Sequence, residues 1–367
     1  MGGVETVAAA VQADLAARLP SQNKKQREGL ALLVATALDV RSVNLMELAA
    51  ALPRAAERLD MRYQWISRLL GNTRIEVEAV MAPYAREVLA RACAGSRALV
   101  VIIDQSKVND THHMVMVSLR VGERALPLAW RVKKTQGAIG FREQRAALAT
   151  VAALLPEGVR PTLMGDRFYG SPALIAWCRD HGWGWRLRCK QDLLVFDHTG
   201  GATTLAECFT HGEHRLENVA LTGQRARTHV AMLQEEGQAE PWIIAMSDLP
   251  TTGRARDYGL RWGIEAMFSD FKTRGFHLEA SQIERTDRLD RLVLVLALAL
   301  YWAVSTGMWD AIENRTPAEK KAVAAQRKNV ARSLMSLFKR GLRRIRFCLQ
   351  RLIAPPPLWA AWKNDGW

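Results

Sequence analysis

Residues 98–104, Ala-Leu-Val-Val-Ile-Ile-Asp, open the part of the sequence that decides the fold. A continuous apolar run that ends in an acidic residue is typical of a buried strand reaching the edge of a sheet. Two further strand-like stretches follow at 113–121 and 125–132, separated by the turn-forming pair Gly122-Glu123. The sequence therefore predicts a sheet that begins with three successive strands.

The next segments alternate between helix and strand patterns. The sequence predicts a helix over 141–155, a short strand over 162–165 that ends in Asp166, a helix over 171–180 and a strand over 183–187. Three strands, helix, strand, helix and strand is the order of an RNase H-like domain. We therefore expect an α/β fold with a mixed-sheet core, in which functional groups gather at the ends of strands.

The flanking segments complete the predicted organisation. Helical patterns cover 1–95, and short strand-like stretches separated by turn signals indicate a β-rich insertion at 190–247. We therefore predict a helical region over 1–95, a mixed-sheet core over 96–310 that contains the insertion, and a basic helical extension over 311–367. Within the core, residues 292–309 lack charge but include Ser305 to Gly307, and we interpret them as a buried helix.

Composition favours a polyanionic partner. The 367 residues include 51 Lys and Arg against 37 Asp and Glu, a net charge of +14, so nucleic acid is the leading candidate. A membrane surface is the alternative, but the basic residues are spread along the chain and form no single amphipathic basic segment. The five cysteines lack a C-x-x-C pair, which indicates reduced thiols and no zinc site. We expect a cytoplasmic, nucleoid-associated protein without a membrane partner, because no secretory signal pattern is present at the N-terminus.

Tyr258, Arg261, Glu265 and Lys272 share one face of a predicted helix over 256–272. At about 100° per residue, they fall within an arc of roughly 60°. A carboxylate suits Mg²⁺ or Mn²⁺, while Arg and Lys on the same face suit a phosphate. The face therefore predicts half of a metal-dependent phosphodiester site. The alternative is a solvated amphipathic face with ion pairs between neighbouring turns.

Asp104 and Asp166 end two predicted neighbouring strands, so both carboxylates are expected at one edge of the sheet. Glu265 joins them from the helix, and it is preferred to Asp270, which lies about 120° from Tyr258 on the helical wheel. Three such carboxylates would hold two Mg²⁺ or Mn²⁺ ions roughly 3.5–4 Å apart. An aspartate after a strand is also a common turn or capping residue when it stands alone.

The segment Tyr258-Gly-Leu-Arg261-Trp-Gly-Ile-Glu265-Ala-Met-Phe-Ser-Asp-Phe-Lys272 resembles the Y-(2)-R-(3)-E-(6)-K signature of the IS4-type DDE transposases, the family that includes the Tn5 and Tn10 transposases. The contexts Asp104-Gln-Ser and Gly165-Asp166-Arg-Phe-Tyr-Gly resemble the first and second catalytic aspartates of that family. The resemblance implies cut-and-paste transposition of an insertion sequence. It assigns catalysis and metal binding to Asp104, Asp166 and Glu265.

The resemblance also implies roles for residues that bind DNA. In the family, the Tyr, Arg and Lys of the signature hold terminal phosphates, which assigns those roles to Tyr258, Arg261 and Lys272. Trp242 resembles the tryptophan that receives a flipped base during a hairpin step, although a core tryptophan fits its apolar surroundings equally well. Trp262 is expected either to stack on terminal bases or to pack inward.

Three further expectations concern partners and rival functions. Residues 45–70 resemble a helix-turn-helix region in which Arg62 and Arg68 contact phosphates, with surface arginines as the alternative. The family acts as dimers on terminal inverted repeats and target DNA, which implies a homodimer on double-stranded DNA. The rival functions are an RNase H-like nuclease that cuts DNA without joining it, and a non-catalytic DNA-binding protein derived from a transposase.

Overall fold

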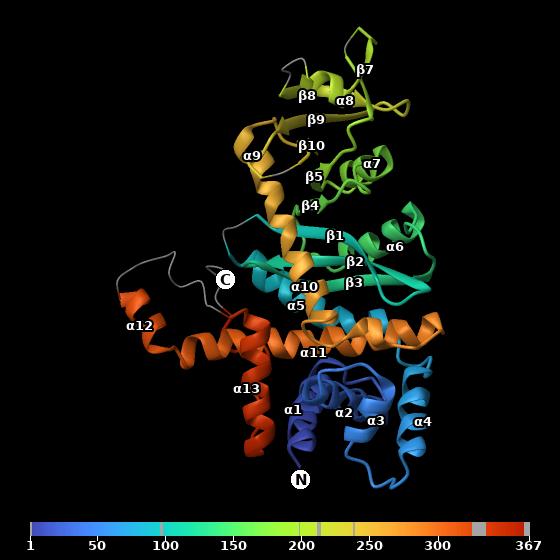
Figure 1. Ribbon diagram of the computed structural model, residues 1–367, viewed down its shortest axis with the longest axis vertical. Helices are drawn as coiled ribbons and strands as arrows, with labels where there is room; N and C mark the ends of the chain where they lie inside the picture. The colour runs from blue at the N-terminus through green and yellow to red at the C-terminus, as the bar shows by residue number, and fades with distance from the viewer. Residues whose placement is uncertain are drawn as a thin grey trace. The chain divides into compact units, whose positions relative to one another are not determined.

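The computed structural model describes residues 2–95, 98–197, 199–210, 214–237, 239–324 and 335–362 (Figure 1). The chain divides into two compact units, the first made of residues 1–84, 107–112 and 268–364, and the second of 85–106 and 113–267. Part of the predicted basic tail, including Arg327, Lys328 and Arg332, lies outside the described residues.

The first unit is built from helices, and the helices predicted within the first 95 residues are present. Asn23 and Asn44 begin two of them, because their side chains accept hydrogen bonds from backbone N–H groups of the first turn. The helices are α1 (Gly3–Arg18), α2 (Lys24–Val40), α3 (Leu45–Ala51), α4 (Leu59–Leu70), the start of α5 (Val77–Cys93), the 3₁₀ helix η2 (Leu278–Ala280), α11 (Thr286–Glu313), α12 (Pro317–Ala324) and α13 (Leu337–Arg351).

Helix α11 forms the core of this unit. By length and composition it is the one described helix that could cross a membrane on its own, but 94% of its most apolar window is buried inside the protein. Helix α13 packs on α11 at two glycines, Gly307 and Gly341, where a Cβ atom would collide with the backbone carbonyl of Leu337 or Ala303. The prediction that 292–309 forms a buried core helix is confirmed.

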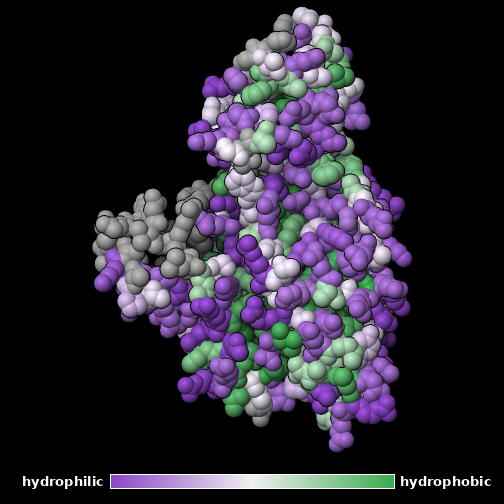
Figure 2. Space-filling view, in the orientation of Figure 1, coloured by the Kyte–Doolittle hydropathy of each residue, from purple (hydrophilic) through white to green (hydrophobic). Residues whose placement is uncertain are grey.

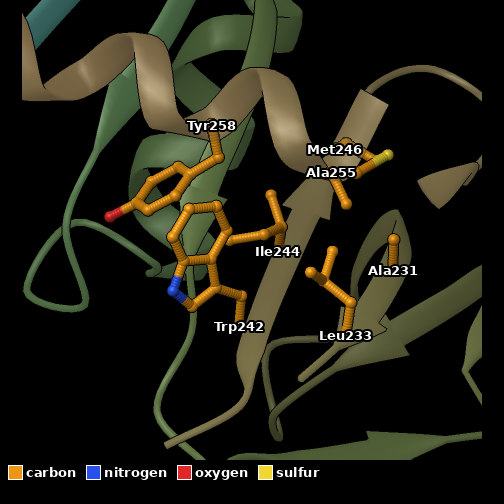
Figure 3. Close-up of a cluster of buried hydrophobic side chains, with 7 residues drawn as sticks. All are labelled: Ala231, Leu233, Trp242, Ile244, Met246, Ala255 and Tyr258. Atoms are coloured by element: carbon orange, nitrogen blue, oxygen red, sulfur yellow. The ribbon is translucent and has the colours of Figure 1, made fainter. Parts of the chain in front are cut away.

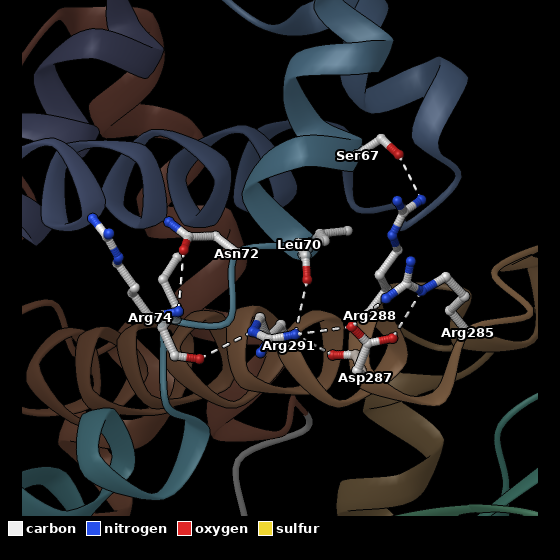
Figure 4. Close-up of polar contacts among 9 residues, drawn as sticks. Ser67, Leu70, Asn72, Arg74, Arg285, Asp287, Arg288 and Arg291 are labelled. Atoms are coloured by element: carbon white, nitrogen blue, oxygen red, sulfur yellow. Dashed lines mark hydrogen bonds and ion pairs between the residues drawn. The ribbon is translucent and has the colours of Figure 1, made fainter.

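Arginines at the start of α11 hold the end of α4 (Figure 4). The buried guanidinium of Arg291 donates hydrogen bonds to the carbonyl oxygens of Leu70 (3.2 Å) and Ile75 (3.0 Å). Arg288 donates to the hydroxyl of Ser67 (2.8 Å). These cations satisfy acceptors at the carboxyl end of a helix, where positive charge is favoured. Part of the positive charge of the chain is therefore structural and does not face a polyanion.

The second unit contains a mixed sheet of ten strands together with helices (Figure 1). The strands are β1 (Val100–Lys107), β2 (His112–Val121), β3 (Arg124–Lys134), β4 (Thr162–Gly165), β5 (Gly184–Arg188), β6 (Leu194–Phe196), β7 (Ala202–Thr204), β8 (Arg215–Leu221), β9 (Ala226–Leu233) and β10 (Trp242–Met246). The helices are α6 (Phe141–Ala152), α7 (Pro172–Asp180), α8 (Leu205–Thr210), α9 (Thr252–Arg256), the 3₁₀ helix η1 (Asp257–Trp262) and the first turn of α10 (Gly263–Phe271).

The strand order is β3-β2-β1-β4-β5-β10-β9-β8-β6-β7. Strand β4 lies parallel to both β1 and β5, whereas β5, β10, β9, β8, β6 and β7 pair in antiparallel fashion. Along the chain, β1 to β3, α6, β4, α7 and β5 follow one another in the predicted succession. The predicted RNase H-like mixed-sheet core is confirmed. Helices α6 and α7 contribute apolar faces that include Leu148 and Ile175.

The strands of the predicted β-rich insertion continue the same sheet. β10 pairs with β5, with Ala245 opposite Leu187, and the remaining insertion strands follow outward from β10. Trp185 on β5 fixes this junction, because its indole N–H donates a hydrogen bond to Thr228 on β9 (2.9 Å). Strand β7 and helix α8 were not predicted from the sequence. The surface on view in Figure 2 is mainly hydrophilic, with hydrophobic residues scattered across it.

Candidate active site

Asp104 and Asp166 are placed together by the register of β1 and β4. In this parallel pair Val100 to Ile103 lie opposite Thr162 to Gly165, so each aspartate follows the last paired residue of its strand. Parallel strands present their carboxyl ends at one edge of the sheet. The predicted meeting of the two carboxylates at a sheet edge is therefore present in the structure.

Backbone N–H groups orient both carboxylates. The N–H of Gln105 donates to Asp104 Oδ1 at 2.8 Å, and the N–H of Phe168 donates to Asp166 Oδ1 at 2.9 Å. The Asp104 side chain is only 14% exposed, whereas Asp166 is half-buried. Each carboxylate retains oxygen lone pairs for other partners, since an ionised carboxylate accepts about four hydrogen bonds.

The segment that carries Glu265 differs from the predicted regular helix. Residues 257–262 form the 3₁₀ helix η1, and a regular α-helix begins only at Gly263. The shared face nevertheless survives from Tyr258 to Glu265. Residues three apart are eclipsed in a 3₁₀ helix, which aligns Tyr258 with Arg261, and residues four apart are neighbours in an α-helix.

Arg261 joins the helical segment to the sheet edge. Its Nη1 donates to Asp104 Oδ2 at 2.9 Å, and its Nη2 donates to Glu265 Oε1 at 2.6 Å. The arginine side chain is nearly buried, while Glu265 is 56% exposed. One guanidinium therefore links the strand-borne carboxylate to the helix-borne one.

The pKa of Asp104 shows that the acidic groups share one electrostatic environment. Burial, together with the charges of Asp166 and Glu265, raises this pKa from 3.8 to about 6, against the opposing effects of Arg261 and the Gln105 N–H. Burial, followed by the charges of Asp104 and Asp166, raises the pKa of the Tyr169 phenol well above its ordinary value. Perturbed ionisable groups gathered at a strand end are typical of an active site.

Comparison with protein families adds an independent observation. Residues 142–302 match the Transposase DDE domain family. The matched segment contains Asp166, Arg261 and Glu265, begins after Asp104 and covers less than half of the chain. The match supports a DDE transposase, an enzyme that acts on DNA and belongs to a family that generally uses divalent metal ions. The chain matches no curated protein.

The chemistry of these carboxylates suits hard divalent cations. Asp104 and Glu265 share the Arg261 guanidinium, Asp166 lies at the end of the neighbouring strand, and carboxylate oxygen is the ligand that Mg²⁺ prefers. Among the residues that the structure describes, however, no three Asp, Glu, His or Cys side chains are already gathered as a metal site. That Asp104, Asp166 and Glu265 hold Mg²⁺ or Mn²⁺ stays a prediction.

Tyr258 and Trp242 lie in a buried cluster beside the site (Figure 3). Trp242 is only 5% exposed, and its ring meets those of Tyr258 and Trp262 edge to face, with centroids 5.4 Å and 5.6 Å apart. Burial raises the pKa of Tyr258 to about 12. Trp242 therefore occupies a core position in this structure, and its role in a hairpin step stays a prediction. Trp262, in contrast, is 47% exposed.

Lys272 does not lie on the helix as predicted. Helix α10 ends at Phe271, and the chain then turns so tightly that a Cβ atom on Gly275 would collide with the carbonyl of Asp270. The Lys272 ammonium forms an ion pair with Glu279 at 2.8 Å. The expectation of one regular helix through 256–272 is therefore wrong at both ends, because η1 precedes α10 and a turn follows it.

The two N-terminal arginines differ in their surroundings. Arg62 of α4 donates to the carbonyl oxygens of Ala50 (3.1 Å) and Glu57 (3.3 Å), which stabilises the connection between α3 and α4. Arg68 is exposed and donates to Gln64 (3.2 Å). A contact with phosphate remains a prediction for both residues, and Arg68 is the better placed of the two.

Sequence reasoning missed Gln105 as a supporting residue. Its side-chain oxygen accepts a hydrogen bond from the N–H of Ile139 (2.6 Å), and its amide nitrogen donates to Gly137 (3.2 Å). Gln105 thus ties the end of β1 to the loop that precedes α6. Its position directly after Asp104 was the available signal.

Proposed function

We propose that this protein is a DDE transposase of the IS4 type, which cleaves DNA at the ends of an insertion sequence and joins the freed 3′ ends to target DNA. The observation that carries the proposal is the bridge from Arg261 to Asp104 and Glu265, beside Asp166 and within a chain that matches the Transposase DDE domain. A structural ion pair alone does not require a third carboxylate at the end of the neighbouring strand.

The proposed chemistry assigns a task to each residue of the site. Two divalent cations held by Asp104, Asp166 and Glu265 would supply charge stabilisation at the phosphate and activate the attacking oxygen. Arg261 offers five N–H donors in a planar fork, which suits a phosphate when the carboxylates are shared with cations. Lys272 and the Tyr258 hydroxyl are proposed phosphate contacts on the basis of the resemblance to IS4-type enzymes.

The wider proposal concerns DNA, assembly and location. The helical region that contains Arg62 and Arg68 is proposed to bind the terminal inverted repeats, and the net charge of +14 supports a DNA partner. A homodimer acting on two DNA ends in the cytoplasm, and a hairpin step that uses Trp242, are proposed from the resemblance.

A strand-transfer assay tests the proposal. The purified chain is incubated with Mg²⁺, a labelled duplex that carries the inverted repeat flanking the coding region, and a supercoiled target plasmid. A transposase yields joined product, a nuclease yields only cleaved end, and a non-catalytic binding protein yields neither. Glu265→Gln serves as the inactive control. Failure of the wild-type chain to join DNA under conditions in which it binds the repeat would overturn the proposal.

A further inference from the structure

The turn that follows Asp166 exposes an aromatic ring beside the active site. Phe168 is 64% exposed, the largest exposure of any large hydrophobic side chain in the described part of the chain. Its neighbour Tyr169 is buried against Gly165 and is influenced by the charges of Asp104 and Asp166. The turn therefore buries the ring of Tyr169 and leaves the ring of Phe168 exposed.

This turn is held firmly in place. The N–H of Phe168 donates to the carboxylate of Asp166 (2.9 Å), and the N–H of Tyr169 donates to the Asp166 carbonyl (2.9 Å). Gly170 packs so closely on β5 that a Cβ atom would collide with the carbonyl of Arg188. The backbone that carries the exposed ring is thus fixed by a carboxylate of the DDE site itself.

Phenylalanine stabilises a fold mainly through the burial of its ring, so a ring that is 64% exposed contributes little to stability. Two arginines lie close to the turn. Arg167, the preceding residue, and Arg188 both pair with Glu240, at 3.1 Å and 3.6 Å. An exposed ring next to arginines and a phosphodiester site has the composition of a stacking contact for an unpaired nucleobase. A protein partner would require a broader apolar patch.

We propose that Phe168 stacks on the base next to the scissile phosphate after that base has left the duplex stack. The inference rests on the proposed function, because it requires DNA at the Asp166 carboxylate. Bases inside a duplex have both faces covered, so the ring selects a nucleotide that is frayed, flipped or at a nick. Phe168 is thereby a positioning residue for the strand that is cut.

Photocrosslinking tests the contact without requiring catalysis. End DNA that carries 5-iodouracil at single positions on either side of the cleavage site is irradiated with the protein in the absence of divalent cations, and the crosslinked peptide is sequenced by mass spectrometry. We expect a crosslink at Phe168 from one position only, retained in Phe168→Tyr and lost in Phe168→Ala. Leu249→Ala, which removes another exposed apolar side chain of the same unit, should leave the crosslink unchanged.

Affinity measurements complete the test. Phe168→Ala should weaken binding of end DNA by about 5- to 150-fold with an unchanged melting temperature. An abasic nucleotide at the crosslinking position should weaken binding by the wild-type protein but not by Phe168→Ala, because the two changes remove the same contact. Additive losses, or crosslinks only at other residues, would overturn this inference alone. Failure of the wild-type chain to bind end DNA would overturn the proposed function as well.

Discussion

The strand-borne carboxylates and the helix-borne carboxylate of the site are held by different means. Asp104 and Asp166 follow four consecutive paired residues of β1 and β4, and backbone N–H groups fix their side chains. Glu265 instead follows a 3₁₀ helix, is more than half exposed and depends on the Arg261 guanidinium for its connection to Asp104. Backbone pairing sets the first two positions, whereas side-chain contacts set the third.

This difference predicts unequal tolerance to mutation. A parallel ladder places strand ends with little dependence on the identity of individual side chains. A 3₁₀ helix has poorer hydrogen-bond geometry and gains its position from packing, here of Tyr258 on Trp242. Substitutions near η1 should therefore displace Glu265 while leaving Asp104 and Asp166 in place.

The largest expected effect comes from removing each carboxylate charge at nearly constant volume. Asp104→Asn, Asp166→Asn and Glu265→Gln should each reduce Mg²⁺-dependent cleavage by roughly 10³-fold or more, because each removes the charge of a proposed metal ligand. Binding of end DNA should remain close to that of the wild type. Cleavage rates on labelled end DNA measure the effect.

A matched control for this series is Asp248→Asn. Asp248 is about half exposed just after β10, where it pairs with Arg186 at 3.1 Å, and its loss should leave cleavage unchanged. It is preferable to Asp270, which is buried. If Glu265→Gln cleaved normally while the two aspartate variants did not, the helix-borne carboxylate would not belong to the site.

The strand-borne part of the site could be predicted from the sequence, whereas the conformation of the helix-borne part could not. The apolar run before Asp104 and the strand before Asp166 are local signals. Because the two strands are predicted to be neighbours in the sheet, the two aspartates are predicted to lie close together. The 3₁₀ turn is not a local signal, because it depends on Gly263 passing so close to β3 that a Cβ atom would collide with the backbone of Arg124. The burial of Trp242 and the pairing of β10 with β5 likewise depend on residues distant in the sequence.

The next effect contrasts a buried tryptophan with an exposed one beside the same helix. Trp242→Ala should lower the free energy of unfolding by about 3–5 kcal/mol, because it opens a cavity under Tyr258, whereas Trp262→Ala should cost less than about 1 kcal/mol. Denaturant melts measure both. If Trp242→Ala and Trp262→Ala lowered the free energy of unfolding equally, the buried cluster in Figure 3 would not stabilise η1.

Trp242→Leu separates packing from the proposed hairpin role, because it keeps a large apolar side chain but removes the aromatic face on which a base would stack. If the indole receives a flipped base, this variant should nick at the normal rate and slow the following step, by up to the 5- to 150-fold expected for loss of a stacked base. Nicking and strand closure that fall together would assign Trp242 to the core alone.

A smaller effect is expected when the link between strand and helix is removed. Arg261→Gln should destabilise the protein by about 3 kcal/mol, because it leaves the buried Asp104 carboxylate without its cation. Arg256→Gln, which breaks the exposed pair with Glu235, should cost less than about 1 kcal/mol. In a double-mutant cycle, Asp104→Asn should recover part of the loss, and strictly additive values would show that the two side chains do not interact.

The smallest expected effect is a pH dependence that arises from Asp104, whose pKa is about 6. Because this pKa lies above the ordinary value of 3.8, the protonated carboxyl stabilises the metal-free fold at low pH, and that contribution is lost as pH rises through about 6. Cation binding has the opposite dependence, since a bound cation requires the ionised carboxylate. The apparent affinity for Mn²⁺, measured by the shift in melting temperature, should therefore rise about tenfold per pH unit below pH 6 and level off above it. Asp104→Asn should flatten this rise, whereas Asp248→Asn should preserve it. An Asp104→Asn variant with the wild-type slope would assign the titration to another group and remove the strand-borne carboxylate as the source of the pH dependence.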